Sequence, residues 1–387
     1  MKPVLNVVAI GGPHQFAHFL PVAFELHRRG HCHVAVFVPE PADAAQIAVL
    51  AGELGAPLPE IATMDLPPAL EACVPPKARK LARLLAWSHR IRAGSAVLCA
   101  ERTSTILKRL PGRCPPLIHI PHGAGDRAVG FEKRFALFDK VIVAGRKDRE
   151  RLLAERIVPP ERCAVAGPIK VSTMLRLAPS RPPLFDNGRP VILYNPHFCK
   201  RLSSARAITR RLVETIARDD RYNLVIAPHL RMAQNWNGPR RREWEDMAVP
   251  GRVAVDLGSR RSVDMTYTLG ADLYLGDVSS QVYEFLVRPR PCLFVNSHGA
   301  AWQGSEDYAM WRFGEVIAPE APVASAIERA FSRHGEFLPV QKERTRAALD
   351  GVGWDEQGRI AFHGGDPVAK AADIIEADML NGPGTGI

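Results

Sequence analysis

Short apolar segments alternate with amphipathic segments along most of the chain. The segments VLNVVAI, HVAVFV, AVLCA, LIHI, KVIVAG and CAVAG are hydrophobic at nearly every position, not at every second one. Between the first two lies FAHFLPVAFELHRRG, whose apolar residues recur every three or four positions, and AAQIAVLAGEL follows the second. Continuous apolar strands separated by helices are typical of a parallel sheet that is covered on both faces. The pattern therefore predicts an α/β protein.

The alternation stops and then restarts in the middle of the chain. Residues 174–190, MLRLAPSRPPLFDNGRP, hold four prolines and little periodicity, which is typical of a connection between domains. Beyond it the strands VILYN, YNLVIA, RVAVD, DLYLG and PCLFVN alternate with helices expected near 203–218, 262–269 and 279–287. After residue 365, DPVAKAADIIEADML predicts a terminal helix with an aspartate cap and a proline in its first turn.

Two consecutive series of this kind predict two doubly wound, Rossmann-like domains that face each other across a cleft. A chain of 387 residues is also longer than a single core usually requires. The predicted parts are an acceptor-side domain (1–173), a linker (174–190), a donor-binding domain (191–365), and a helix with a flexible tail (366–387). In such sheets ligands bind beyond the carboxyl ends of the strands.

A proline–histidine pair follows four of the apolar segments, two in each predicted domain. The histidines are His14, His122, His197 and His229. Because the carboxyl ends of parallel strands meet at one edge of a sheet, these imidazoles are expected to converge on the cleft. For any single pair, a proline that ends a strand and a histidine that caps the next turn explain the residues equally well. That explanation is weaker for all four together.

The formal net charge of +10 favours anionic partners, namely nucleotides, phosphorylated substrates, nucleic acid or an acidic membrane surface. A nucleic-acid-binding protein would need basic side chains interleaved with exposed aromatic ones, or a recognisable module, and the sequence has neither. No nucleic-acid partner is therefore predicted. The seven cysteines are scattered singly, without a C-x-x-C pair, which favours a reducing compartment.

The N-terminal sequence does not resemble a signal peptide, and no segment approaches the roughly 20 apolar residues that span a bilayer. A cytoplasmic location is expected. Residues 77–92, KARKLARLLAWSHRIR, carry six Lys or Arg and no acidic residue, with leucines and Ile91 at helical spacing. This segment predicts a basic amphipathic helix that attaches to the anionic inner face of the cell membrane. An ordinary surface helix with a solvated basic face explains it equally well.

The segment ADLYLGDVSSQVYEFLV has the order of an anion site. An apolar strand is followed by Asp277, then by Ser279 and Ser280, and then by the start of a helix. Two hydroxyls and the first free amides of a helix favour a phosphate at this point, and Glu284, about one turn further on, can reach a ribose hydroxyl. The alternative is that Asp277 or Ser279 is only an N-cap.

This segment, followed by RPRPCLFVN, resembles the C-terminal signature of the CDP-glycerol glycerophosphotransferase family, whose members have a GT-B scaffold. HGAGD is similar to the family's His-Gly-Thr segment, YNPHF to its Tyr-Ala-Pro-Thr segment, and APHL to its Arg-Pro-His-Pro segment. The resemblance covers roughly residues 115–296. It implies that Ser279 and Ser280 hold the donor pyrophosphate and that His122 and His229 lie at the reacting centre.

Three positions depart from the family pattern. Ala124 and His197 each stand where the family has threonine, and Ala227 replaces an arginine. The implied donor is therefore a CDP- or UDP-linked conjugate and need not be CDP-glycerol itself. The first domain also resembles GT-B sugar transferases at GGPHQF, which implies His14 as an alternative base.

The predicted function is that of a metal-independent GT-B transferase. It would move a polyol phosphate or a sugar from a nucleotide-diphosphate donor to a lipid-linked or cell-envelope polysaccharide acceptor, without a cofactor. His122 is predicted to deprotonate the acceptor, with Asp126 orienting its ring, while His229 and His197 contact the donor. The alternatives are a non-hydrolysing UDP-sugar 2-epimerase, whose elimination needs acids for which only Asp126 and Asp277 are candidates, and a non-enzymatic anion-binding protein.

Overall fold

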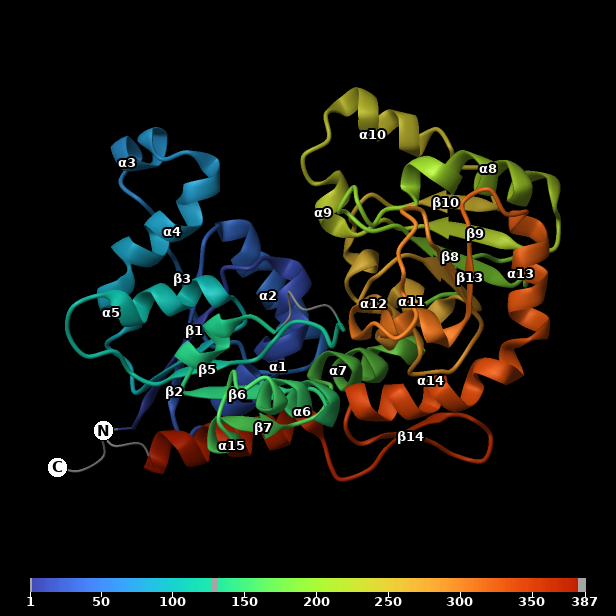
Figure 1. Cartoon of the computed structure of the whole chain (residues 1–387). Helices are drawn as coiled ribbons and strands as arrows, with labels where there is room; N and C mark the ends of the chain where they lie inside the picture. Colours follow the sequence, from blue (N-terminus) through green and yellow to red (C-terminus); the bar gives the residue numbers. More distant parts are fainter. Residues whose placement is uncertain (1, 127–130, 382–387) are drawn as a thin grey trace.

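The computed structural model describes residues 2–126 and 131–381. Its elements gather around two parallel sheets, which Figure 1 shows side by side. We call the elements around the first sheet the N-terminal lobe and those around the second sheet the C-terminal lobe. The α/β class predicted from the hydrophobic pattern is confirmed.

The first sheet has seven strands in the order β3-β2-β1-β4-β5-β6-β7. The strands are β1 (Val4–Val8), β2 (His33–Val38), β3 (Glu60–Thr63), β4 (Ala96–Cys99), β5 (Leu117–His119), β6 (Lys140–Val143) and β7 (Cys163–Val165). All residues of β4 and β5 are buried, because helices cover both faces of the sheet. This burial explains why these strands are apolar at consecutive positions.

Between the first strand and residue 177, the α-helices of the described residues are α1 (Pro13–Arg29), α2 (Pro41–Glu53), α3 (Pro68–Cys73), α4 (Pro76–Ala86), α5 (Ser88–Ile91), α6 (Arg146–Ala154) and α7 (Ile169–Leu177). Helix α1 begins at a proline, whose missing N–H costs nothing in the first turn. It ends at Gly30, whose left-handed conformation (φ 71°) lets its N–H bond to the carbonyl of Leu26.

The second sheet has six strands in the order β10-β9-β8-β11-β12-β13. They are β8 (Val191–Asn195), β9 (Asn223–Ile226), β10 (Val253–Val255), β11 (Leu273–Gly276), β12 (Cys292–Val295) and β13 (Glu315–Ile317). The helices of this part of the chain are α8 (Ala205–Arg218), α9 (Leu230–Ala233), α10 (Gly238–Glu245), α11 (Thr266–Gly270), α12 (Gln281–Phe285), α13 (Val323–Ser332) and α14 (His334–Ala348).

Both sheets reverse their strand order at one internal point. In the first sheet the reversal lies between β1 and β4, and in the second it lies between β8 and β11. A crevice opens at such a reversal, because the connections on its two sides leave in opposite directions. His14 follows β1, whereas His197 follows β8 and the serine pair follows β11. The fold therefore brings chemically active residues to both reversal points.

The chain returns to the N-terminal lobe after α14. An antiparallel hairpin, β14 (Val352–Trp354) and β15 (Ile360–Phe362), leads into α15 (Pro367–Asn381), which packs on α1 (Figure 1). Arg29 on α1 pairs with Asp373 at 2.7 Å and with Glu376 at 2.8 Å. The terminal helix was predicted, but its attachment to the first lobe was not. At the predicted linker, α7 continues to Leu177, since Met174 is buried in the core.

The basic segment 77–92 forms two helices, α4 and α5, and not one. The break is at Trp87, whose indole N–H donates to the Asp65 carbonyl at 2.9 Å. Leu84 is buried, whereas Leu81 and Leu85 are 39% and 40% exposed, so only part of the apolar stripe faces the core. In the described ranges no helix is long and apolar enough to cross a membrane.

Candidate functional site

The two histidines of the N-terminal lobe meet at the edge of the first sheet. His14 lies in the first turn of α1, just after β1, and His122 lies in the loop after β5. Their ring centroids are 5.8 Å apart, and the rings are nearly perpendicular. Two segments that are about a hundred residues apart therefore contribute imidazoles to one place.

Both ring nitrogens of His122 have partners. Nδ1 lies 3.3 Å from the carbonyl oxygen of Ala100, which can only accept, so Nδ1 carries the hydrogen. Nε2 is then an acceptor, and it lies 3.4 Å from the side-chain amide nitrogen of Gln15. The same amide donates to Glu101 Oε1 at 2.8 Å. Gln15 therefore connects His122 to a carboxylate.

The side chain of Gln15 is held by close packing as well as by these hydrogen bonds. It is only 2% exposed, and a Cβ atom at Gly11 would collide with its Oε1. Glycine at position 11 thus makes room for the amide. Burial raises the pKa of Glu101, but Lys80, the hydrogen bond from Gln15 and the charge of His122 and His14 when protonated outweigh it and lower the pKa, so that Glu101 keeps its charge.

Asp126 does not orient His122, so this prediction is wrong. The chain turns at Gly123 (φ 93°), and the Asp126 carboxylate instead accepts from the Tyr283 hydroxyl at 2.8 and 2.9 Å. Lys147 lies 3.1 Å from the same carboxylate, and Arg344 lies 3.5 Å from it. Asp126 is 2% exposed and joins the two lobes. The carboxylate connected to His122 is Glu101.

The two histidines of the C-terminal lobe form a second pair. The ring centroids of His197 and His229 are 5.7 Å apart, and Phe198 lies 4.7 Å from the His229 ring. Nδ1 of His229 accepts from the backbone N–H of Arg231 at 3.3 Å, and Nδ1 of His197 accepts from the N–H of Cys199 at 3.0 Å. These bonds fix both rings at the start of the loops that follow β8 and β9.

Asp277 holds the loop that carries His197 in place. Its carboxylate is fully buried and accepts the backbone N–H of His197 at 2.8 Å and that of Ser204 at 3.0 Å. The sequence predicts Asp277 as part of the donor-binding segment that also holds Ser279 and Ser280. Because its oxygens are occupied by backbone amides, it instead positions the loop that carries His197.

The histidine pairs of the two lobes lie close enough to influence each other's charge. Burial, then His122 and His229, lower the pKa of His14 to about 4. Burial, then Arg231 and His122, lower the pKa of His229 to about 4. Burial also lowers the pKa of His122, although Glu101 opposes this effect. His14, His122 and His229 are therefore neutral at pH 7, and Nε2 of His122, which carries no hydrogen, can accept a proton.

Acid is expected to destabilise the protein through these histidines. The pKa of histidine is about 6.5 in an unfolded chain, so between pH 6.5 and 4 the unfolded state binds more protons than the folded state. The free energy of unfolding should therefore fall as the pH falls through this window, by about 1–2 kcal/mol for each of His14 and His229 after allowance for partial exposure.

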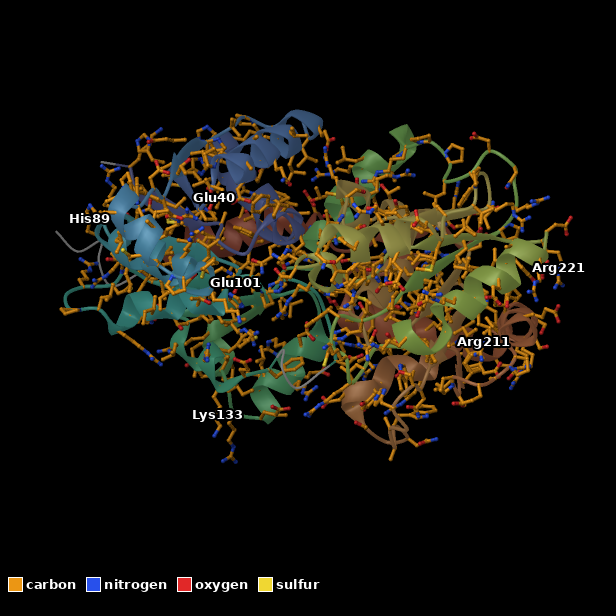
Figure 2. All side chains as sticks on the ribbon, turned by 90° about the horizontal axis from the view of Figure 1, so that it is seen from above. Glu40, His89, Glu101, Lys133, Arg211 and Arg221 are labelled. Carbon is orange, nitrogen blue, oxygen red and sulfur yellow. The ribbon has the colours of Figure 1, made fainter. Side chains whose placement is uncertain are left out.

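Thermal unfolding between pH 7.5 and 4.5 measures this effect. The double variant His14→Gln/His229→Gln should show a flatter dependence than the parent. His89→Gln is the control, because His89 is exposed and lies farther from the second lobe than Glu101 does (Figure 2). If the stability of the double variant and that of the parent depend equally on pH, His14 and His229 are not the cause of the acid destabilisation.

The serine pair lies where the C-terminal lobe meets the glycine-containing loop of the N-terminal lobe. Ser279 is 5% exposed, and its hydroxyl accepts from the N–H of Gln281 at 3.3 Å. A Cβ atom at Gly123 would lie 3.0 Å from the Ser280 hydroxyl, so glycine permits this close approach. The helix that follows, α12, is short, with only five residues. A phosphate group that binds at Ser280 would therefore also contact the N-terminal lobe.

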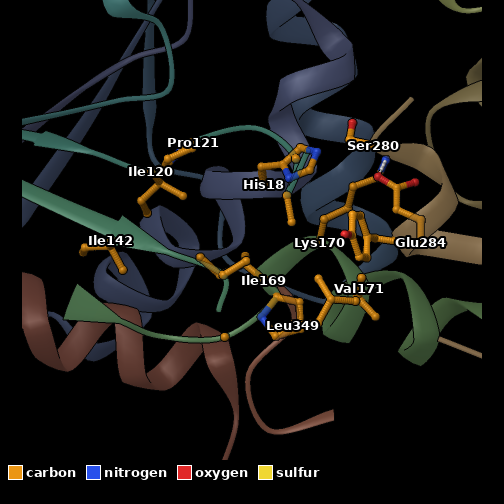
Figure 3. Close-up of a pocket in the computed structure, with 16 residues that line it drawn as sticks. His18, Ile120, Pro121, Ile142, Ile169, Lys170, Val171, Ser280, Glu284 and Leu349 are labelled. Atoms are coloured by element: carbon orange, nitrogen blue, oxygen red, sulfur yellow. Dashed lines mark hydrogen bonds and ion pairs between the residues drawn. The ribbon is translucent and has the colours of Figure 1, made fainter. Parts of the chain in front are cut away.

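A pocket of about 480 Å³, including its open mouth, lies beside Ser280 at the boundary of the lobes (Figure 3). In its wall Lys170 pairs with Glu284 at 2.7 Å, and the two side chains are 6% and 13% exposed. Lys170 belongs to α7 and Glu284 to α12, so this ion pair also joins the two lobes. The lining residues are His18, Ile120, Pro121, Gly123, Ala124, Ile142, Ala144, Gly167, Pro168, Ile169, Lys170, Val171, Ser280, Tyr283, Glu284 and Leu349.

Four residues at the site were not singled out from the sequence. Glu101 follows the apolar strand AVLCA, and Lys170 follows CAVAG, so the position beyond the strand end was a usable signal for both. His18 lies four residues after His14 on α1, which places the two on one helix face. Gln15 had no such signal, because its role depends on contacts with Gly11 and Glu101. Within residues 2–126 and 131–381, no three His, Cys, Asp or Glu side chains are grouped to hold a metal ion.

No model of a known protein family matches the chain, and no curated protein sequence matches it. Solved structures do resemble it. The wall teichoic acid polymerase TagF has a TM-score of 0.62 at 13% identity, over 98% of this chain and 90% of that one. UDP-GlcNAc 2-epimerase from Neisseria meningitidis, bound to UDP-GlcNAc, has a TM-score of 0.59 at 12% identity, over 97% and 99%.

S. aureus MnaA, in a structure with UDP, has a TM-score of 0.62 at 14% identity, over 98% of this chain and 97% of that one. These neighbours are enzymes with the GT-B fold. The GT-B architecture predicted from the sequence is therefore confirmed. At identities of 12–14% the likeness shows the fold and leaves the reaction open.

Proposed function

We propose that the protein is a GT-B transferase that uses a nucleotide-diphosphate donor. The transferred group would be a polyol phosphate or a sugar, and the acceptor a lipid-linked or cell-envelope polysaccharide. One observation carries this proposal. The serine pair after β11 lies directly against the loop of His122, so that a donor phosphate bound at Ser280 is next to candidate bases.

The roles follow from the chemistry of the side chains. A neutral imidazole, His122 or His14, removes the proton from the acceptor hydroxyl as the oxygen attacks the donor, a contribution of about 10²- to 10⁴-fold. If the acceptor replaces the Gln15 amide at Nε2 of His122, the charge of Glu101 stabilises the resulting imidazolium. His229 and the nearby exposed Arg231 are suited to contact the departing nucleotide phosphate.

A second candidate function is a non-hydrolysing UDP-sugar 2-epimerase. Elimination and re-addition of the nucleotide need an acid or base beside the sugar. Asp126 and Asp277 are engaged in other contacts. The carboxylate of Glu101, however, is linked to His122 through the side chain of Gln15. This observation favours the epimerase more than the sequence alone did.

A binding screen followed by a product assay separates these functions. Thermal-shift measurements with CDP, UDP, GDP, CMP and their sugar or polyol conjugates identify the donor. Incubation of the stabilising conjugate without an acceptor then gives an epimer for the second function, whereas the transferase leaves the sugar configuration intact. If no nucleotide stabilises the protein, both functions are excluded.

The serine pair is expected to dominate binding of the donor phosphate. Hydrogen bonds to charged groups contribute about 1.5–3 kcal/mol, so Ser279→Ala/Ser280→Ala should weaken nucleotide binding by about tenfold or more. The fold should be kept, because alanine fits both positions. Calorimetric titration gives the dissociation constant, and Ser332→Ala, at an exposed position on α13, is the matched control. If the double variant binds the nucleotide as tightly as the parent, the donor phosphate does not bind at Ser279 and Ser280.

Attachment to an anionic membrane is proposed for the exposed part of segment 77–92. Arg83 is buried between Glu40 and Glu71, so the basic residues left for a membrane include the exposed Lys77 and Arg90. Leu81 and Leu85 are exposed apolar residues of the same segment. Each basic residue at such a surface contributes about 1 kcal/mol. Lys77→Glu/Arg90→Glu should therefore weaken binding to vesicles that contain phosphatidylserine by about 30-fold or more.

Co-sedimentation with these vesicles measures the effect. The matched control is Arg206→Glu/Arg218→Glu, which makes the same change of net charge on α8 of the other lobe. An equal loss of vesicle binding in both double variants would show that the net charge of the protein, and not segment 77–92, drives binding.

A further inference from the structure

One buried cation at the boundary of the lobes lacks a full set of partners. The side chain of Lys170 is only 6% exposed, yet among the described residues its ammonium group has a single hydrogen-bond partner, Glu284 Oε1 at 2.7 Å. An ammonium group carries three N–H donors, and a buried donor without a partner is costly. Two N–H groups of Lys170 are therefore available to a ligand.

A second buried lysine at the same boundary shows the contrast. Lys147 donates to the Asp148 carboxylate at 2.7 Å and to the Gly125 carbonyl at 3.3 Å, and its ammonium lies 3.1 Å from Asp126. All three N–H groups of Lys147 can therefore be bonded within the protein. A lysine that only joins the lobes is expected to have such a set of partners, so the joining of the lobes does not by itself account for Lys170.

The pocket beside Ser280 is the space that Lys170 lines. Figure 3 shows Lys170 and Glu284 together with Ser280, and His18 contributes to the same wall. Burial and then the charge of Lys170 lower the pKa of His18 well below its usual value, so its imidazole is neutral. The polar wall of the pocket therefore presents a hydroxyl, an imidazole and a cation to one ligand, which favours an anion.

Lys170 also lies near the histidines that are candidate bases. Burial lowers the pKa of His14 most, and Lys170 is among the charges that lower it further. The His14 ring lies 5.8 Å from that of His122, so an anion held by Lys170 is close to both imidazoles. The flexible stem of four methylene groups allows the ammonium to move toward such an anion while α7 stays in place.

We propose that Lys170 is a ligand of the donor diphosphate and that it exchanges its ion pair with Glu284 for one with a phosphate oxygen. This inference rests on the proposed function, because the serine pair contacts the same phosphate from the other lobe. A diphosphate has several charged oxygens, so it can accept from the N–H groups that Glu284 leaves unbonded. Glu284, once released by Lys170, is free to accept a hydrogen bond from the ribose.

Inorganic pyrophosphate tests this role, because it carries the two phosphates of a donor without the ribose or the base. Lys170→Met/Glu284→Gln removes both charges and leaves neither of them unpaired. This double variant should bind pyrophosphate about tenfold more weakly or worse in calorimetric titrations of the full chain. The matched control is Lys108→Met/Asp139→Asn, which removes another 2.7 Å ion pair at the start of β6, on the sheet edge opposite to the site.

Glu284→Gln alone distinguishes a phosphate ligand from a lysine that only joins the lobes. The substitution removes the carboxylate that competes with the anion for Lys170, so pyrophosphate should bind about threefold tighter or more. If Lys170 only joins the lobes, the single and the double variant should change pyrophosphate binding in the same direction or not at all. That result overturns the inference. If Glu284→Gln does not fold, the double variant decides, since parent-like binding by it contradicts the role of Lys170.

Failure of this inference is distinguishable from failure of the proposed function. If Ser279→Ala/Ser280→Ala weakens nucleotide binding but Lys170→Met/Glu284→Gln does not weaken pyrophosphate binding, the donor site stands and the role of Lys170 is wrong. That role is also wrong if the parent binds a nucleoside diphosphate but no pyrophosphate at about 10 mM. If the parent binds neither, the proposed function fails as well.

Discussion

His122→Ala is expected to lower turnover by at least about 10²-fold while donor affinity changes little. The imidazole is held by the Ala100 carbonyl and by Gln15, and it is neutral at pH 7 because burial lowers its pKa. Loss of a general base removes an interaction that acts mainly in the transition state, so kcat should fall and KM should not.

Steady-state kinetics with the donor found in the nucleotide screen measure this effect. His229→Ala should also raise the KM for the donor, because His229 lies in the same lobe as Ser279 and Ser280 and is proposed to contact the departing nucleotide phosphate. His89→Ala, on the exposed surface, is the control. If His122→Ala keeps its activity while His14→Ala loses it, the base is His14, and the resemblance to sugar transferases is the better guide.

Asp126→Ala is expected to lower the free energy of unfolding by about 2–3 kcal/mol. The substitution leaves the buried Tyr283 hydroxyl without its acceptor, and it removes one of the two carboxylates that pair with Lys147 and Arg344, which keep Asp148 at 2.7 Å and Glu306 at 3.0 Å. Burial lowers the pKa of Lys147, but Asp148 and Asp126 outweigh this effect and raise it, so the ammonium stays charged. A buried hydroxyl without an acceptor, beside two cations that have each lost one counter-charge, accounts for the expected loss.

Urea denaturation of the purified variant measures the loss. Tyr283→Phe is the matched control, because it removes one neutral hydrogen-bond donor to the same carboxylate and should cost only about 1 kcal/mol. A loss for Asp126→Ala no greater than that for Tyr283→Phe would mean that Asp148 and Glu306 are sufficient partners for the two cations. Asp126 would then contribute little to the joining of the lobes.

Local patterns in the sequence were sufficient for the central strands and for their common edge. They missed β3 (Glu60–Thr63) and β13 (Glu315–Ile317), because each lies at the margin of its sheet and is only partly buried. VILYN and LIHI are buried strands because they are apolar at consecutive positions, and the proline–histidine pairs follow them as expected. Whether a segment is buried depends mainly on its own apolar residues, so the burial of these strands can be predicted from each segment alone. The break at Trp87 was missed, because it depends on a hydrogen bond to a residue 22 positions away.

The partners of the charged residues could not be predicted in the same way. Asp126 lies four residues from His122 in sequence, yet its carboxylate bonds to Tyr283 from the other lobe. Glu101 lies 21 residues from His122 and is connected to it through Gln15. Such pairings follow from the order in which strands lie in the sheet, since β4 stands between β1 and β5. That order is a property of the whole fold.

The return of α15 to α1 has a consequence for the way the chain is made. Ala371, Ala372 and Ile375 are fully buried, in the same apolar cluster as Leu20 and Ala23 of α1. During synthesis, the face of α1 that they cover is exposed from the time it leaves the ribosome until some 350 further residues have followed. The first lobe therefore cannot reach its final packing until the terminal helix has been made.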